Sequence, residues 1–61
     1  METQILQAIT DSNGNISYFQ IDTQVFVGTA DALAYLQSLP AGMYMAQTIT
    51  AVGTSVLAMV P

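Results

Sequence analysis

The chain has 61 residues and contains no lysine, arginine, histidine or cysteine; its four acidic side chains give a formal net charge of −4 at pH 7. Without imidazole or thiol groups it lacks the usual pairs of nucleophile and base and the usual nitrogen and sulfur ligands of transition metals. Without basic side chains it has nothing to neutralise the phosphates of a nucleic acid. The sequence therefore predicts a non-catalytic protein with no cofactor, no metal, no small-molecule substrate and no nucleic-acid partner.

The size and composition predict one small domain, residues 1–61, that works in association with other protein chains. A domain of this size buries only about 60% of the surface of its unfolded chain. Such small folds usually add disulfides, a metal or a partner, and without cysteine the first of these is impossible. Only 7% of the residues are charged, against about 25% in typical soluble domains. Association is therefore the expected source of extra stability.

Residues 3–27 predict a β-hairpin whose turn lies in the segment 11–15, Asp-Ser-Asn-Gly-Asn. Asn-Gly is the strongest two-residue hairpin signal. With Asn13 and Gly14 as the loop, Ile9 pairs with Tyr18 and Ile5 pairs with Asp22. One face then carries the apolar side chains of Leu6, Ala8, Phe19, Ile21 and Val25, which predicts the core side. The other face is mixed, carrying Ile5, Gln7, Ile9, Tyr18, Gln20, Asp22, Gln24 and Phe26. Because a face in contact with water should be more uniformly polar, this mixed face is a predicted contact surface.

Residues 29–39 predict a short helix. Thr29 is the predicted N-cap, and Asp31 lies in the first turn, where the helix dipole favours a negative charge. Pro40 disfavours helical geometry at the residue before it and ends the helix. Leu33 and Leu36 lie on one side of the helix, which is too short to persist alone and must pack on the hairpin.

Residues 43–60 predict a C-terminal β region. Gly53-Thr54 fits a two-residue hairpin loop, although Gly53 also fits a bulge in one long strand. The expected fold is α+β, a small ββαβ(β) domain with an antiparallel hairpin, one helix and one or two C-terminal strands. Its predicted core is Leu6, Phe19, Ile21, Val25, Leu33, Leu36 and Ile49.

The turn at Asp11 also matches the start of a calcium-binding loop, with Asp22 at the twelfth position. The match fails at Ile16, where the loop needs glycine, and at Asp22, where it needs glutamate. A structural turn without a metal is the better interpretation. No basic segment followed by an apolar stretch comes after Met1, so no signal peptide is expected. The C-terminal region is too polar for a predicted membrane span.

The candidate interface residues come from two places. Met43 and Met45, with Tyr44 between them, fit either a core or an adaptable binding surface. Together with the mixed face of the hairpin, the candidate protein-interface residues are Ile5, Ile9, Tyr18, Phe26, Met43, Tyr44 and Met45. The edge of the C-terminal strand is an alternative interface.

The Thr-, Gln-, Ala- and Val-rich composition, poor in charge and free of cysteine, resembles that of small virion accessory proteins of bacteriophages. The Asp-Ser-Asn-Gly-Asn turn resembles hairpin tips of phage fibre and decoration proteins. The resemblance implies a structural protein of the virion: a capsid decoration, cement or minor coat subunit. Two alternatives remain open. One is a small acidic inhibitor that lies in the cytoplasm and docks a basic partner. The other is a subunit of a self-assembling filament that is joined through exposed strand edges.

Overall fold

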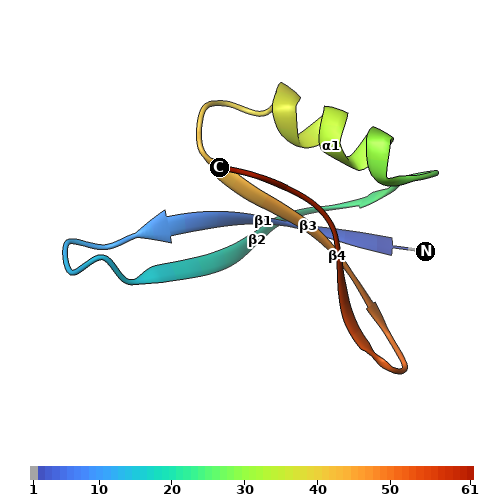
Figure 1. Cartoon of the computed structure of the whole chain (residues 1–61), viewed down its shortest axis with the longest axis horizontal. Coiled ribbons are helices and arrows are strands. Elements are labelled where there is room, and N and C mark those ends of the chain that lie inside the picture. Colours follow the sequence, from blue (N-terminus) through green and yellow to red (C-terminus); the bar gives the residue numbers. More distant parts are fainter. Residues whose placement is uncertain (1) are drawn as a thin grey trace.

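The computed structural model describes residues 2–61 and shows one four-stranded antiparallel sheet and one helix (Figure 1). The elements are β1 (Glu2–Thr10), β2 (Ile16–Val25), α1 (Thr29–Ser38), β3 (Met43–Thr50) and β4 (Gly53–Val60). Their order in the sheet is β2-β1-β3-β4, so two hairpins lie side by side and meet where β1 pairs with β3. This ββαββ arrangement confirms the predicted α+β fold class.

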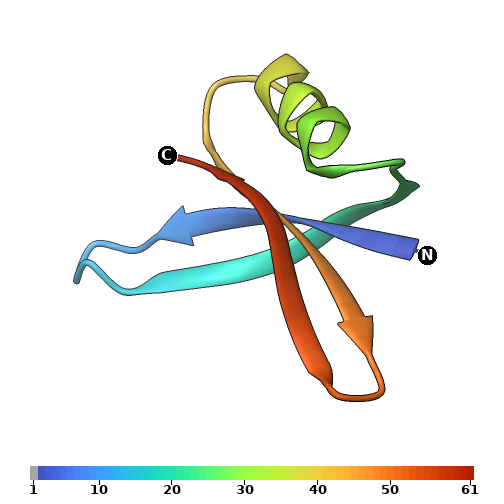
Figure 2. The same ribbon diagram turned by 45° about the vertical axis from the view of Figure 1, so that its right-hand side comes forward.

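The sheet is strongly twisted, and the helix covers only part of one side. The two hairpins cross in projection, and α1 lies to one side of the sheet (Figures 1 and 2). The helix packs against β3 and β4. The turn end of the β1–β2 hairpin therefore extends beyond the helix, and no helix or strand of the described residues lies above the opposite side of the sheet. We call that opposite side the open face.

The turn of the first hairpin is one residue longer than predicted. Thr10 pairs with Ile16, and the backbone N–H of Asp11 donates to the Asn15 carbonyl at 2.9 Å. Three residues, 12–14, thus form the loop, and Gly14 takes a positive φ of 83°. This geometry is typical of three-residue hairpin loops, which end in a left-handed residue.

The side chain of Asp11 explains why this longer loop forms. Its carboxylate accepts the backbone N–H groups of Asn13 at 2.8 Å and of Asn15 at 2.9 Å. An aspartate that bonds the backbone two residues on stabilises such a turn locally. These bonds are also why the pKa of Asp11 lies below its ordinary value, with the Asn15 N–H as the largest cause.

A β-bulge in β2 then restores the predicted register in part of the hairpin. Ile5 pairs with Asp22, as predicted, whereas Leu6 pairs with Gln20 and leaves Ile21 as the extra residue. Between the turn and this bulge, the register of β2 against β1 is shifted by one residue from the predicted register. Every β2 side chain in this segment therefore lies on the opposite face from the one predicted relative to β1. Tyr18 therefore lies opposite Ala8 instead of Ile9.

The C-terminal β region forms a second hairpin, β3–β4, and not one long strand with a bulge at Gly53. Thr50 pairs with Gly53, so Ala51 and Val52 form the loop in place of the predicted Gly53-Thr54. Gly53 takes a φ of 132°, and the Thr50 hydroxyl accepts the Val52 N–H at 3.3 Å. A second bulge leaves Leu57 unpaired in β4, next to Ala58, and Leu57 packs against the core.

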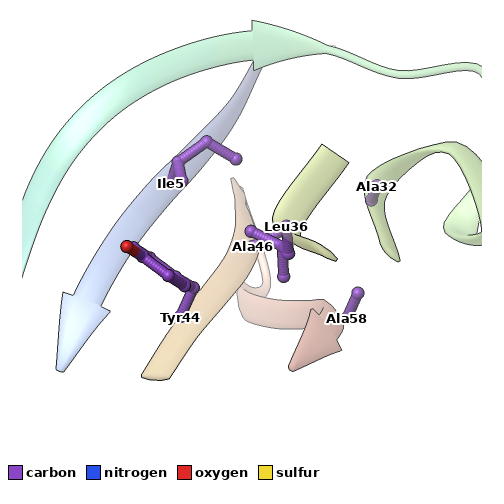
Figure 3. Packing of buried hydrophobic residues seen from close by; sticks show 6 residues of the cluster. All are labelled: Ile5, Ala32, Leu36, Tyr44, Ala46 and Ala58. Carbon is purple, nitrogen blue, oxygen red and sulfur yellow. The ribbon is translucent and has the colours of Figure 1, made fainter. Parts of the chain in front are cut away.

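The core lies between α1 and the side of the sheet that carries Ile5, and not on the predicted side. Ile5 is 0% exposed and Leu36 is 1% exposed, and Figure 3 shows Leu36 next to Ala46 of β3. The buried apolar side chains are Ile5, Ala32, Leu36, Tyr44, Ala46 and Ala58. Three alanines here let the helix approach the strands closely, which explains why it packs on this side.

The predicted core is consequently wrong for all but Leu36. Phe19 is 53% exposed because the turn end of its hairpin lies beyond the helix. Leu6 is half-buried on the open face. The remaining members of the predicted core are exposed: Ile21, Val25, Leu33 and Ile49.

Candidate functional site: the open face of the sheet

The open face is built from rows of side chains that run across the strands. Residues directly opposite one another in paired strands project to the same side of a sheet. One row consists of Gln20, Leu6, Met45 and Met59; a second consists of Tyr18, Ala8 and Met43; a third consists of Thr23, Gln4, Gln47 and Val56. The third row is tied together by the Gln47 side-chain amide, which donates to Gln4 Oε1 at 2.9 Å.

The centre of the open face is apolar. Leu6, Met43 and Met45 are half-buried by their neighbours within the sheet, while Val56 and Met59 are exposed. An antiparallel sheet with one face in water normally alternates apolar side chains inward and polar side chains outward. Here both faces carry large apolar groups, so the open face departs from this pattern and forms an exposed apolar surface.

The charges of the chain lie away from this centre. Asp22 pairs with Ile5 and so belongs to the helix side, Asp31 lies on α1, and Asp11 lies in the turn. Glu2 alone shares the open face, at the end of β1. A complementary surface would therefore need apolar groups and hydrogen-bonding groups rather than charges.

A polar cluster on the helix side fixes β2 to the helix. The Tyr35 hydroxyl donates to Asp22 Oδ2 at 2.6 Å, and the Gln24 amide donates to the same oxygen at 2.7 Å. The ring of Tyr35 lies 5.6 Å from that of Phe26. This cluster orients α1 over the core and leaves the opposite face free. Periodicity did not identify it, because the cluster joins a strand to the helix that follows it, and the pattern within either element alone does not show which side chains meet.

The cluster makes stability depend on pH in two windows. The Tyr35 hydroxyl, followed by Gln24 and the Thr23 N–H, lowers the pKa of Asp22, and the bond to Asp22 raises the pKa of Tyr35. The Asp22 contribution is thus present above its unfolded pKa, about 4, and is lost as the pH falls through the lower folded pKa. The Tyr35 contribution is present below about pH 10 and is lost as the pH rises through the higher folded pKa.

Thermal unfolding, followed by circular dichroism across pH, checks this dependence. We expect the melting temperature of the wild type to fall at both ends of the range. Tyr35→Phe should lower it near neutral pH and weaken both declines, while the acid decline due to Asp11 remains. An unchanged pH profile in Tyr35→Phe would show that the cluster does not stabilise the fold.

The candidate interface residues from the sequence do not lie on one surface in the structure. Tyr18, Met43 and Met45 lie together on the open face, as neighbours in the rows described above. Ile5 and Tyr44 are buried in the core, and this corrects their assignment to a surface.

The two remaining candidates, Phe26 and Ile9, lie in different places. Phe26 packs against the core beside Tyr35, and Ile9 is exposed near the turn end of the first hairpin. The predicted mixed face is therefore not one continuous surface. Leu6, Ala8, Val56 and Met59 also lie on the open face, although the sequence did not assign them to an interface. Alternation places Leu6 opposite in direction to Ile5, but only the position of the helix decides which of the two is left uncovered.

The structure shows no other site of this extent in residues 2–61. Within this range we find no pocket and no group of three acidic side chains placed to hold a metal ion. None of the helical structure in the described part of the chain is long and apolar enough to cross a membrane. Comparison of the chain with models of protein families, with curated proteins and with solved structures gives no match.

Proposed function

We propose that this chain is a non-catalytic structural subunit of a larger protein assembly and that it docks through its open face. The observation that carries this proposal is the uncovered apolar row of Leu6, Met45 and Met59. Residues 2–61 contain one helix, which covers one of the two faces of the sheet. The domain exposes 4050 Å² in all. An interface of standard size takes about 800 Å² from each partner, so one such contact would cover about a fifth of the domain.

The small core supports the same proposal. Its large buried side chains are those of Ile5, Leu36 and Tyr44, and the others are alanines. A core of this size rarely supplies more than about 3–5 kcal/mol of stability. Covering the open face would add a second apolar layer on the other side of the sheet, and with it the stability that disulfides supply in other small folds.

Within this class we infer a bacteriophage virion accessory protein: a capsid decoration, cement or minor coat subunit. The support is the resemblance in composition and in the turn at Asp11. A surface with so few charges also suits a subunit that stays covered, since free domains use surface charge to prevent association. The acidic-inhibitor alternative has less support, because the four acids lie on the turn, the helix, β2 and a corner of the sheet rather than on one surface.

The proposal is tested by co-sedimentation of the tagged chain with particles from its source organism. Particles purified on a density gradient should carry the wild-type chain and keep it at high salt, because burial of apolar area rather than ion pairing holds it. Met45→Asp should reduce the bound amount about tenfold or more, because a carboxylate buried without a partner costs several kcal/mol. Val52→Asp, in an exposed loop off the open face, is the matched control and should bind like the wild type.

Other outcomes are equally informative. A wild-type chain that stays in the free soluble fraction would contradict the virion assignment. Recovery with one basic protein, and release from it by salt, would support the inhibitor alternative instead. Equal binding of Met45→Asp and Val52→Asp would show that the docking surface lies elsewhere.

A further inference from the structure

The outer edge of β2 is a second uncovered surface, separate from the open face. β2 is the first strand of the sheet and pairs only with β1. All side chains from Ile16 to Ile21 are exposed, and α1 packs over β3 and β4 at the other end of the sheet. Natural proteins protect such edges with charges, prolines or a covering element. The segment 16–20, Ile-Ser-Tyr-Phe-Gln, has no charge and no proline.

The hydrogen bonds of the turn indicate which backbone groups point outward. In an antiparallel pair, residues alternate between those bonded to the neighbouring strand and those that face away from it. Asp11 donates to the Asn15 carbonyl, so by alternation Ser17 and Phe19 bond to β1. The backbone N–H and C=O groups of Ile16, Tyr18 and Gln20 then point outward. The bulge at Ile21 ends this regular segment.

We propose that this edge pairs with the same edge of a second copy, antiparallel and about a two-fold axis at Tyr18. The three outward residues are evenly spaced, so Tyr18 would lie opposite Tyr18 of the second copy, and Ile16 opposite Gln20. The pairing would satisfy all six outward backbone groups on each side. It would join the two sheets into one of eight strands and leave both open faces on the same side, free to dock.

The charges and the other edge of the sheet favour this occupant. The chain has no basic side chain, so a second copy can pair only through an uncharged segment, and 16–20 is such a segment. The other edge strand, β4, starts at Gly53 and is interrupted by the bulge at Leu57. Its regular runs are shorter, which disfavours pairing of β2 with β4. Pairing of β2 with itself gives a closed dimer, whereas pairing with β4 would give an open filament.

Disulfide cross-linking tests the proposed axis. Because the native chain has no cysteine, any disulfide must form at the introduced residue. Residues opposite one another in a hydrogen-bonded antiparallel pair have Cα atoms about 5.5 Å apart, within the range that a disulfide spans. Tyr18→Cys should therefore form a covalent dimer as its main product in a glutathione redox buffer. Val56→Cys is the matched control, because Tyr18 is 42% exposed and Val56 is 52% exposed, and it should stay mostly monomeric. Equal cross-linking of the two variants, or none in Tyr18→Cys, would overturn the proposal.

Sedimentation equilibrium separates backbone pairing from side-chain contact. Wild type and Tyr18→Ala should be dimers at tens of micromolar, whereas Tyr18→Pro, which lacks the outward N–H, should be a folded monomer. A dimeric Tyr18→Pro would overturn the proposal, as would an unfolded one, because the N–H would then be needed within the chain. Met45→Asp should remain a dimer even if it no longer docks on the particle through the open face. The dimer and the proposed function can therefore be disproved independently of each other.

Discussion

Leu36→Ala should lower the free energy of unfolding by about 2–5 kcal/mol, the usual loss for a leucine truncated in a core. Leu36 is 1% exposed and is the largest apolar side chain that α1 buries against the sheet. A domain of this length has a total stability of only about 3–9 kcal/mol by the usual value per residue. The substitution should therefore leave much of the population unfolded at ordinary temperature.

Urea unfolding of the variant beside Leu33→Ala measures this effect. Leu33 lies three residues earlier in the same helix and is 36% exposed, so the same truncation there should cost about 1 kcal/mol or less. The two variants have the same composition and the same change in helix propensity. Equal losses in both would mean that the helix does not present Leu36 to the core.

Ala46→Leu should destabilise the domain by about 1–3 kcal/mol, although it adds apolar volume. Ala46 is fully buried, and its direct neighbours on the helix side of the sheet are Ile5 and Ala58. Extra methylene groups here would force α1 away from β3. The loss of packing over the whole helix would exceed the gain from the added side chain.

Ala8→Leu is the matched control for this prediction. Ala8 lies on the open face, between Tyr18 and Met43, where none of the helices or strands in residues 2–61 covers it. The same enlargement should therefore change the free energy of unfolding by less than about 0.5 kcal/mol. Greater destabilisation by Ala8→Leu than by Ala46→Leu, in paired urea titrations, would place the helix on the other side of the sheet.

The order of the elements was predictable because local signals specify it. Asn13-Gly14 marks the first turn, Pro40 ends the helix, and the β-rich segment after Met43 has a glycine near its centre. The loop lengths were not predictable from these signals. The carboxylate of Asp11 holds a longer turn than Asn-Gly alone would form.

The side of the sheet that the helix covers was not predictable, because β1 is apolar on both of its faces. Ile5 and Leu6 point in opposite directions, and alternation favoured the side of Leu6, whereas the helix covers the side of Ile5. The alanines at 32, 46 and 58 determine which side of the sheet the helix covers, since close approach of the helix is possible only over small side chains. This information is spread over three elements and becomes visible only with the register. For the same reason Met43 and Met45 could be proposed for an interface, while their partners Leu6 and Met59 could not.

The pairing of β1 with β3 has a consequence for the order of events during synthesis. Gln4 lies opposite Gln47, so the first hairpin is complete long before the strand that covers its inner edge has been made. At about 5–20 residues per second, the stretch from the end of β2 to the end of β3 takes roughly 1–5 s to synthesise. An isolated hairpin forms in microseconds but is only marginally stable in water. Until β3 has been made, the inner edge of β1 has no partner within the chain and Ile5 has no core to enter, so the first hairpin becomes stable only when the second half of the domain is complete.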